Sequence, residues 1–377
     1  MRGGGTRIAL CGAMVMLAVS PAHADTLREA LANAYNTNPT LQAARAGQRG
    51  VDEDVVIQRA AGLPQLGGEV SYSEVLDDTY SDPGNLYPDR QLSAGLSLSV
   101  PVYSGGAVRN SVRAAKVRVK AGQADLRATE SAVFSQVTAA YMDVILSEAL
   151  VGLNQNLVDV LGVNLQATSD RFEIGDLTRT DVAQSSARLE LSRGDLRSAR
   201  ANLVQARERY IQLVGREPGV LTPPPPLPNM PASAEEAAAI ALEFNPDLIA
   251  AQERAQAASY DIKVAGSGRL PTIELFTQGN VTDTLGSGSL TVNTGSGASG
   301  DRTTSATAGV RATIPFYQGG RPAAQERKAQ AGASAALEQQ VAVERDVIAQ
   351  VRAAYSSWQA ANAIIASGRA DLCALAR

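Results

Sequence analysis

The chain has 377 residues, with 34 Lys and Arg against 38 Asp and Glu, and contains one histidine and two cysteines. Removal of a secretory signal over residues 1–24 leaves 32 basic against 38 acidic residues, a charge of −6, with no histidine and with Cys373 as the one cysteine. Histidine triads, histidine-ligated zinc, zinc ribbons and internal disulfides are therefore excluded. The acidic balance also argues against nucleic acid as a partner.

The N-terminus has the pattern of that secretory signal. Two arginines precede an apolar region at residues 8–19, and Ala22-His23-Ala24 forms an A-x-A cleavage site. Cys11 lies at the start of the apolar region rather than at its end, which disfavours a lipoprotein. No later segment approaches 18 uninterrupted apolar residues, so we expect no membrane-spanning helix in the mature chain.

A helix followed by a β-hairpin is predicted next. Residues 26–61 are alanine-rich, with an interruption near Asn38-Pro39, and Leu63-Pro64 ends the helical pattern. The hairpin is predicted over residues 66–102, and its return strand alternates apolar residues with Gly, Ser and Gln. Such alternation is typical of a membrane barrel strand, and it also occurs in soluble sandwiches. The apolar positions are Leu92, Ala94, Leu96, Leu98, Val100 and Val102.

A long helical hairpin is predicted over residues 106–215. No proline occurs between Val102 and Glu217, and the one clear break is at Gly175-Asp176. The first arm would be about 100 Å long. Apolar residues on both arms keep a coiled-coil period, which predicts left-handed supercoiling. These are Leu146, Leu150, Leu153, Leu157 and Leu161 before the break, and Val182, Leu189, Leu196, Leu203 and Tyr210 after it.

The same unit is repeated later in the chain. Asn38-Pro39 and Leu63-Pro64 recur 207 residues later, and the segment from Pro101 to Tyr141 recurs 214 residues later. We therefore expect a first repeat over 25–216, a stiff proline-rich linker over 217–231, and a second repeat over 232–377. The second repeat contains a helix, a β-hairpin over 272–316 and a long helix.

The second repeat is shorter than the first. The turn at Gly175 would recur at position 389, beyond Arg377, and the returning helix would follow it. We interpret the sequence as a fragment or a shifted reading frame that stops before the second turn, with natural loss of the partner helix as the alternative.

Four strands per chain cannot close into a barrel. An open sheet edge in lipid leaves backbone groups unpaired, so several chains must contribute strands. Three chains give a twelve-stranded barrel, which is wide enough to enclose a lumen.

The motifs V-P-V-Y-x-G-G and I-P-F-Y-x-G-G at the strand ends, and G-D-L-T-x-x-D-V at the helical turn, resemble the TolC outer-membrane efflux protein family. The resemblance implies an internally duplicated α + β membrane protein. The resemblance further implies a homotrimer that would form a twelve-stranded β-barrel in the outer membrane of a Gram-negative bacterium, continued by a coiled-coil α-helical barrel in the periplasm. It would be a passive duct for efflux or type I secretion, coupled through a periplasmic adaptor to an inner-membrane pump or ABC transporter.

The resemblance also suggests functional residues. Gly175, Asp176 and Leu177 match the periplasmic tip that meets the adaptor, and Thr180 and Asp181 match polar positions at the closed entrance. The simpler interpretation is structural: Gly175 and Asp176 end one helix and cap the next, and Asp181 lies near the positive end of a helix dipole. The missing second turn would supply the partners of the two gate candidates.

Arg311 is alone among Gly, Ser and Thr on the polar face of a predicted strand. It could line the lumen and tune ion preference, or lie near a surface loop. Two alternatives to a channel are a secreted coiled-coil structural or adhesive protein without a lumen, and a carboxylate glycosidase. No acidic pair stands out and Trp358 is the one tryptophan, so we predict no enzyme, catalytic residue, metal or cofactor.

Overall fold

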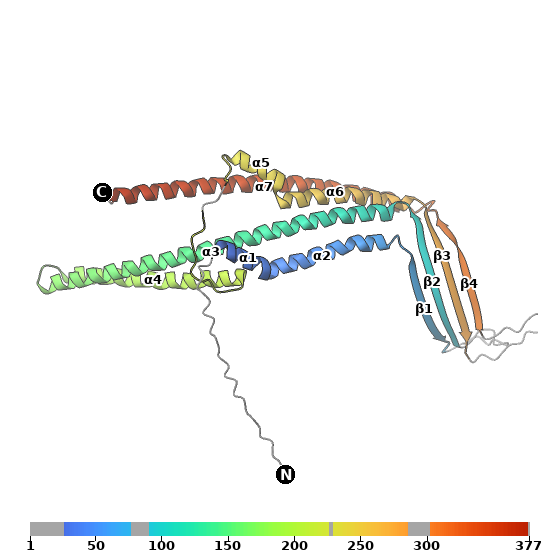
Figure 1. Cartoon of the computed structure of the whole chain (residues 1–377), viewed down its shortest axis with the longest axis horizontal. Helices are drawn as coiled ribbons and strands as arrows, with labels where there is room; N and C mark the ends of the chain where they lie inside the picture. Colours follow the sequence, from blue (N-terminus) through green and yellow to red (C-terminus); the bar gives the residue numbers. More distant parts are fainter. Residues whose placement is uncertain (1–25, 77–89, 226–228, 286–301, 376–377) are drawn as a thin grey trace, which may run out of the picture. The chain divides into compact units, whose positions relative to one another are not determined.

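The computed structural model describes residues 26–76, 90–225, 229–285 and 302–375 (Figure 1). The predicted signal peptide, residues 1–24, lies outside the described residues. The chain forms two compact units, each described by itself: Met1–Pro39 with Ala132–Pro228, and Thr40–Ser131 with Asn229–Arg377.

The first unit contains α1 (Leu27–Thr37), the second part of α3 (Ala107–Glu173) and α4 (Arg179–Val214). Two polar side chains at the end of α1 satisfy carbonyls at the end of α4. Thr37 Oγ1 donates to the Val214 carbonyl at 3.2 Å, and Asn38 Nδ2 donates to the Leu213 carbonyl at 3.0 Å. The last carbonyls of a helix have no partner within it, so α1 completes the end of α4.

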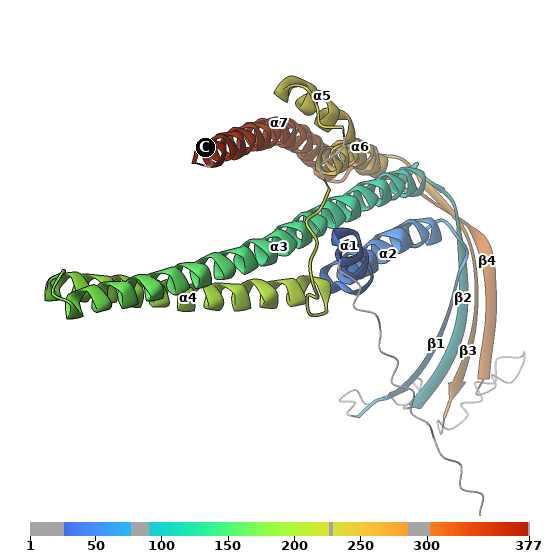
Figure 2. The ribbon, with the colours of Figure 1, turned by 60° about the vertical axis from the view of Figure 1, so that its left-hand side comes forward.

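Helices α3 and α4 lie side by side (Figures 1 and 2). The predicted heptad series on α4 is confirmed as a packed stripe, with Leu189, Leu196 and Tyr210 buried. The leucines of the α3 series from Leu146 to Leu157 do not pack against this stripe, because they are 43–65% exposed in the chain. The α3 side chains that are buried or half-buried along this hairpin instead include Tyr141, Val144, Val151, Val158, Leu165 and Thr168.

Helix α3 therefore carries two apolar stripes, of which α4 covers one. The exposed stripe comprises Leu146, Leu150, Leu153, Leu157 and Val160. By length and composition alone, α3 also contains an 18-residue window apolar enough to cross a membrane, although polar residues interrupt it, and little of that window is buried in the chain.

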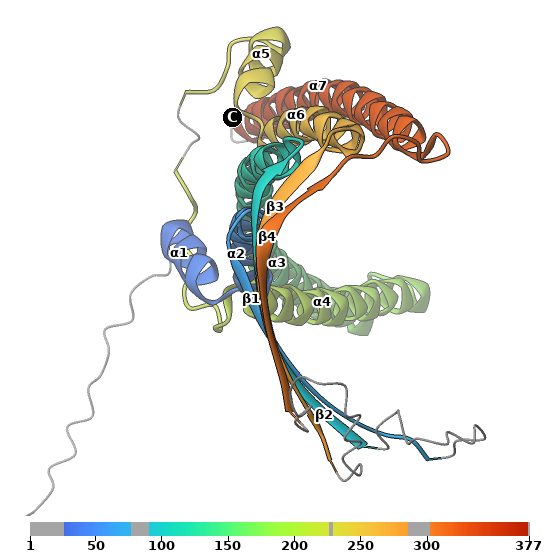
Figure 3. The same cartoon turned by 90° about the vertical axis from the view of Figure 1, so that its right-hand side faces the viewer.

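The helices of the second unit are α2 (Pro39–Ala60), the first part of α3, α5 (Ala234–Phe244), α6 (Pro246–Gly266), the 3-10 turn η1 (Ser267–Arg269) and α7 (Arg321–Leu375). Helices α6 and α7 run side by side (Figures 1 and 3). Ion pairs between Arg118 and Asp261, and between Arg254 and Asp125, join α6 to α3. Asn245 caps α6 by accepting from the backbone N–H groups of Asp247 and Leu248.

Four antiparallel strands complete this unit in the order β1-β2-β3-β4. They are β1 (Gln65–Glu74), β2 (Arg90–Ser104), β3 (Thr272–Thr284) and β4 (Arg302–Thr313). One hairpin comes from each sequence repeat, and β2 pairs with β3 to make one sheet (Figure 3). The strands of both repeats therefore share a unit, so the compact units cut across the repeats.

Proline shapes two strand ends. Strand β2 continues past Pro101 with a bulge before Tyr103, whereas β4 ends at Thr313, ahead of Pro315. The predicted continuation of β4 through Ile314 and Phe316 was wrong. Proline donates no backbone hydrogen bond to a ladder, so it ends a strand or occupies a bulge.

Glycine makes the turn from strand to helix. Gly105 has a φ of +60°, and a Cβ there would lie 2.9 Å from both the Leu270 Cβ and the Ser267 carbonyl oxygen. Its counterpart in the second repeat, Gly319, has the same φ. Any other residue at position 105 would meet both a left-handed backbone and a close neighbour.

Candidate functional site

The turn between α3 and α4 is closed by backbone hydrogen bonds. Gly175 has a φ of +84°, its N–H donates to the Phe172 carbonyl at 2.9 Å, and the Asp176 N–H donates to the Arg171 carbonyl at 2.9 Å. This pair of bonds is the Schellman arrangement, which ends a helix through a left-handed residue. No atom lies within 4 Å of a Cβ at Gly175, so this glycine is required by its backbone conformation alone.

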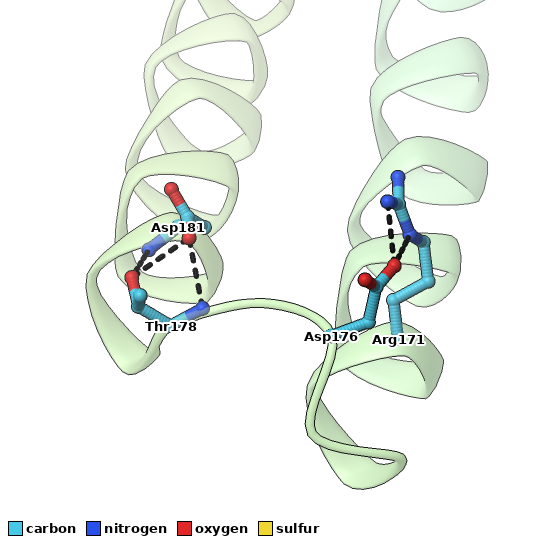
Figure 4. Close-up of polar contacts among 4 residues, drawn as sticks. All are labelled: Arg171, Asp176, Thr178 and Asp181. Atoms are coloured by element: carbon cyan, nitrogen blue, oxygen red, sulfur yellow. Dashed lines mark hydrogen bonds and ion pairs between the residues drawn. The ribbon is translucent and has the colours of Figure 1, made fainter.

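An ion pair lies beside this turn (Figure 4). Arg171 donates from Nε at 2.9 Å and from Nη2 at 2.7 Å to one carboxylate oxygen of Asp176. The expectation that Asp176 caps α4 was wrong, because its carboxylate faces back to α3. Both side chains remain more than half exposed, so the pair contributes little stability and leaves two charges at the surface.

Helix α4 begins with a capping box that the sequence analysis missed. Thr178 Oγ1 accepts from the Asp181 N–H at 3.4 Å, and Asp181 accepts from the Thr178 N–H at 2.9 Å and hydroxyl at 2.7 Å (Figure 4). These bonds, the hydroxyl first, hold the pKa of Asp181 below its ordinary value. The T-x-x-D spacing was the signal that could have revealed this box.

The predicted tip and entrance residues thus have different structural roles. Gly175 and Asp176 belong to the turn, Asp181 belongs to the helix cap, and Leu177 is half-buried between them. Thr180 is exposed on the first turn of α4, and its hydroxyl makes no hydrogen bond among the described residues. Exposed apolar side chains flank the turn, with Ile174 80% and Phe172 42% exposed.

The sheet has one apolar and one polar face. Successive side chains of a strand point to opposite faces. The register of the four strands places most apolar residues opposite apolar residues, and most polar residues opposite polar ones. The apolar face is open to the surroundings in the single chain: Leu66, Val70, Leu96 and Val310 are each more than 60% exposed. The polar face carries Ser71, Ser93, Ser97, Ser99, Gln278, Asn280, Thr282, Ser305 and Thr307.

Aromatic and charged side chains lie at the ends of the apolar face. At the end near the hairpin tips, Tyr72 donates to Glu74 at 2.9 Å, and Arg90 pairs with Glu74 at 3.2 Å. At the end near the helices, Tyr103 lies opposite Ile273 and is 45% exposed. An apolar band between aromatic residues is the pattern of a strand that crosses a bilayer.

Arg311 lies on the polar face, but it is not an isolated charge. It is the direct cross-strand partner of Glu274, to which it donates at 2.9 Å, and its guanidinium lies 4.7 Å from the centre of the Phe276 ring. Arg311 is therefore paired within the sheet, and its position in a lumen stays a prediction. Its charge is largely offset by Glu274.

Within the described ranges, no group of three or more His, Cys, Asp and Glu side chains gathers in a way that could hold a metal ion.

Taken together, a two-faced sheet with unpaired outer strands and helices of 67 and 55 residues define a subunit of a TolC-like outer-membrane channel. The model of the family described as outer membrane efflux protein matches residues 29–216 and 238–373. The chain belongs to this family. It is an outer-membrane protein of the channel class that serves efflux, and the resemblance stated from the motifs is confirmed.

Individual relatives agree with this assignment. The chain is 32% identical over 352 residues to the outer membrane efflux protein BepC of Brucella suis, covering 93% of this chain and 73% of BepC. It is 25% identical to TolC of Escherichia coli, over 92% of this chain and 70% of TolC.

Solved structures share the fold. The structure of CusC matches with a TM-score of 0.74 at 19% identity, covering 93% of this chain and 79% of CusC. The outer membrane protein VceC of Vibrio cholerae matches with a TM-score of 0.70 at 20% identity, covering 90% of this chain and 80% of VceC.

Proposed function

We propose that three copies of this chain form a passive exit duct of a tripartite efflux pump or type I secretion system. The observation that carries the proposal is the sheet. Strands β1 and β4 each pair on one side only, and the apolar face between them is exposed. In lipid an unpaired edge is costly, so β4 of one copy pairs with β1 of the next until the sheet closes.

The polar face then surrounds the lumen, and the apolar face meets lipid. Three sheets of four strands give twelve strands, which leave an aqueous interior. This arrangement places the serines, threonines and amides of the polar face against water. The aromatic residues at the two ends of the apolar face lie at the two membrane surfaces.

The helices supply a second argument for several copies. The exposed leucine stripe of α3 has the spacing of a coiled-coil seam, and α4 already occupies the other stripe. A neighbouring copy buries the leucine stripe and continues the barrel of the strands as a barrel of helices. A homotrimer therefore satisfies the sheet edges and the helix stripe together.

The turn at Gly175, Asp176 and Leu177 is the proposed contact with a periplasmic adaptor. Its support is a rigid Schellman turn that carries an exposed ion pair and exposed apolar side chains at Phe172 and Ile174. Charged and apolar groups on a fixed turn suit docking to a protein partner. Thr180 and Asp181, in the first turn of α4, are the proposed polar residues of the closed entrance.

Energy comes from the partner and not from this chain. An inner-membrane pump or ABC transporter, joined through the adaptor, drives small molecules or proteins through the duct. The duct itself is proposed to have no enzymatic activity.

The decisive experiment purifies the chain from outer membranes in detergent. We expect heat-modifiable trimers by light scattering and ion conductance in planar bilayers. Water-soluble monomers, or elongated oligomers that never conduct, would support a coiled-coil structural protein instead.

A further inference from the structure

We propose that the beginning of α3 carries a docking surface for anionic phospholipid headgroups at the periplasmic face of the outer membrane. This surface, the basic stripe, consists of Arg109, Arg113, Lys116 and Lys120. The inference rests on the proposed function, because it requires that the sheet crosses the bilayer and that the helices continue into the periplasm. It adds a partner that the closure of the sheet does not itself demand.

The basic stripe lies on one face of α3, close to the sheet. Its members are spaced by four, three and four residues, which is the repeat of a single helix face. All four side chains are exposed. The stripe begins six residues after Tyr103, the aromatic residue at the end of the apolar face of the sheet. The stripe therefore starts beside the level at which the strands leave the bilayer.

The charges of the stripe are not compensated within the described chain. Residues 107–124 contain five Lys or Arg and no Asp or Glu, although the mature chain as a whole is acidic. The fifth of these cations, Arg118, pairs with Asp261 of α6. Among the described residues, no ion pair joins a stripe residue to an acid, and this includes the exposed acids at residues 52–54 of α2. Four positive charges thus remain available to an external anion.

The stripe points away from both helices that contact this part of α3. Arg118 marks the side that meets α6. Gln48 of α2 donates to the Val119 carbonyl at 3.3 Å and lies against Gly122. At about 100° per residue, the stripe lies roughly 170° around α3 from Arg118 and roughly 120° from the midpoint of the α2 contact. Both neighbours thus lie toward one side of α3. In a closed ring of helices the neighbours lie toward the inside, so the stripe faces outward.

The second repeat carries a related cluster at the same junction. The first turns of α7 contain three exposed cations, Arg321, Arg327 and Lys328. The one acid among residues 321–337 is Glu326, which pairs with Arg269. Both helices that directly follow a strand therefore begin with an excess of positive charge.

Exposed aromatic side chains lie between the strands and these cations. Phe316 and Tyr317, in the segment between β4 and α7, are 93% and 88% exposed. Together with Arg269 they line a groove of about 320 Å³. Aromatic side chains favour the boundary between acyl chains and headgroups, and a guanidinium donates well to phosphate. Aromatic residues followed by cations match a phospholipid from its acyl chains to its headgroup.

Distance from the bilayer predicts an order of importance within the stripe. Arg109 and Arg113 lie about 3 and 9 Å beyond the start of α3, whereas Lys116 and Lys120 lie about 14 and 20 Å beyond it. The Debye length is about 10 Å at 0.1 M salt, so the two arginines should contribute most to lipid binding.

The test reconstitutes full-length trimers into vesicles of phosphatidylethanolamine with about one third phosphatidylglycerol. The trimers are extracted in mild detergent, and mass spectrometry measures the lipids that stay bound. We expect phosphatidylglycerol to be enriched over the vesicle composition by roughly threefold or more. Arg109→Gln with Arg113→Gln should at least halve this enrichment, and Lys116→Gln with Lys120→Gln should reduce it less.

Two further variants serve as controls. Arg188→Gln with Arg197→Gln removes the same charge from exposed, unpaired positions of α4 in the described chain, and should leave the enrichment unchanged. Arg109→Lys with Arg113→Lys keeps the charge and should keep the enrichment. Heat-modifiable migration verifies that each variant is a folded trimer.

Three results would overturn the inference and leave the channel proposal intact. The first is a wild type that retains the two lipids in the vesicle ratio, and the second is a larger loss in the lysine pair than in the arginine pair. The third is an unchanged lipid ratio with a changed reversal potential in the arginine pair, which would place the stripe in the lumen. Protein that never trimerises would contradict the channel proposal itself.

Discussion

Tyr141 and Thr222 form a two-way hydrogen bond that ties the linker to α3. The Tyr141 hydroxyl donates to the Thr222 carbonyl at 2.6 Å and accepts from the Thr222 N–H at 3.1 Å. Tyr141 is fully buried and its ring lies 6.4 Å from that of Tyr210. The repeat-equivalent Tyr355 likewise binds the end of the linker, because its hydroxyl lies 3.3 Å from the carbonyl of Pro231 and 3.0 Å from that of the next residue, Ala232.

This relationship predicts that Tyr141→Phe destabilises the first unit by about 1–3 kcal/mol, because both backbone groups of Thr222 lose their partner. Hydrogen exchange of residues 217–225, measured by mass spectrometry, should become faster. Tyr260→Phe is the control, since Tyr260 makes no hydrogen bond through its hydroxyl among the described residues. Unchanged protection in Tyr141→Phe would mean that the linker is held by other contacts.

The leucine stripe predicts that Leu153→Lys prevents trimer formation. Leu153 is 65% exposed in the single chain, and a lysine there places a charge in the proposed seam between copies. Asn156→Lys, an exposed α3 position one turn away, should leave the trimer intact. Light scattering of the two detergent-purified variants makes the comparison, and equal trimer content would remove this stripe from the subunit interface.

The tip predicts a charge-specific contact with the adaptor. Asp176→Arg should weaken cross-linking to the adaptor without lowering the amount of folded trimer. The double exchange Arg171→Asp with Asp176→Arg keeps an ion pair in the turn but inverts its direction. Restored cross-linking in the double variant would show that the pair matters for the shape of the turn, whereas continued loss would show that the adaptor recognises the Asp176 charge.

Replacing glycine by alanine should have opposite effects on stability at two positions, Gly175 at the end of α3 and Gly152 within it. Gly175→Ala should destabilise the turn by roughly 1–2 kcal/mol, because alanine opposes a φ of +84°. Gly152→Ala, in the interior of α3 with no atom near its Cβ, should stabilise the helix by about 1 kcal/mol. Denaturant unfolding of both variants gives the two signs, and a destabilising Gly152→Ala would contradict open space at that position.

The capping box predicts an acid-sensitive start of α4. Because the pKa of Asp181 is lowered in the folded chain, its contribution to stability is present above the ordinary aspartate pKa and is lost as pH falls through the lowered value. Hydrogen exchange of residues 178–186, corrected for intrinsic rates, should show loss of protection below about pH 4. Asp181→Asn should remove this pH dependence, and Thr178→Ser should preserve it. A wild-type tip with constant protection down to about pH 2 would contradict the assignment.

Much of the fold was available from local patterns. The absence of proline between Val102 and Glu217 predicted the long helices, and strict alternation predicted β2, because helices and strands repeat with different periods. The positive φ of Gly175 followed from its position at the end of a helix. The paired motifs of the two repeats were by themselves sufficient to indicate the family.

Other features depend on which residues meet across the chain. Heptad spacing identified an apolar stripe on α3 but not the helix that covers it. The sequence of a helix with two apolar stripes does not show which of them packs against α4. Alternation placed Arg311 on a polar face, but only the register of β3 and β4 brought Glu274 opposite to it. Periodicity is a property of one segment, whereas pairing is a property of two. The partners of such an ion pair are far apart in the sequence, and they meet only when the chain has folded.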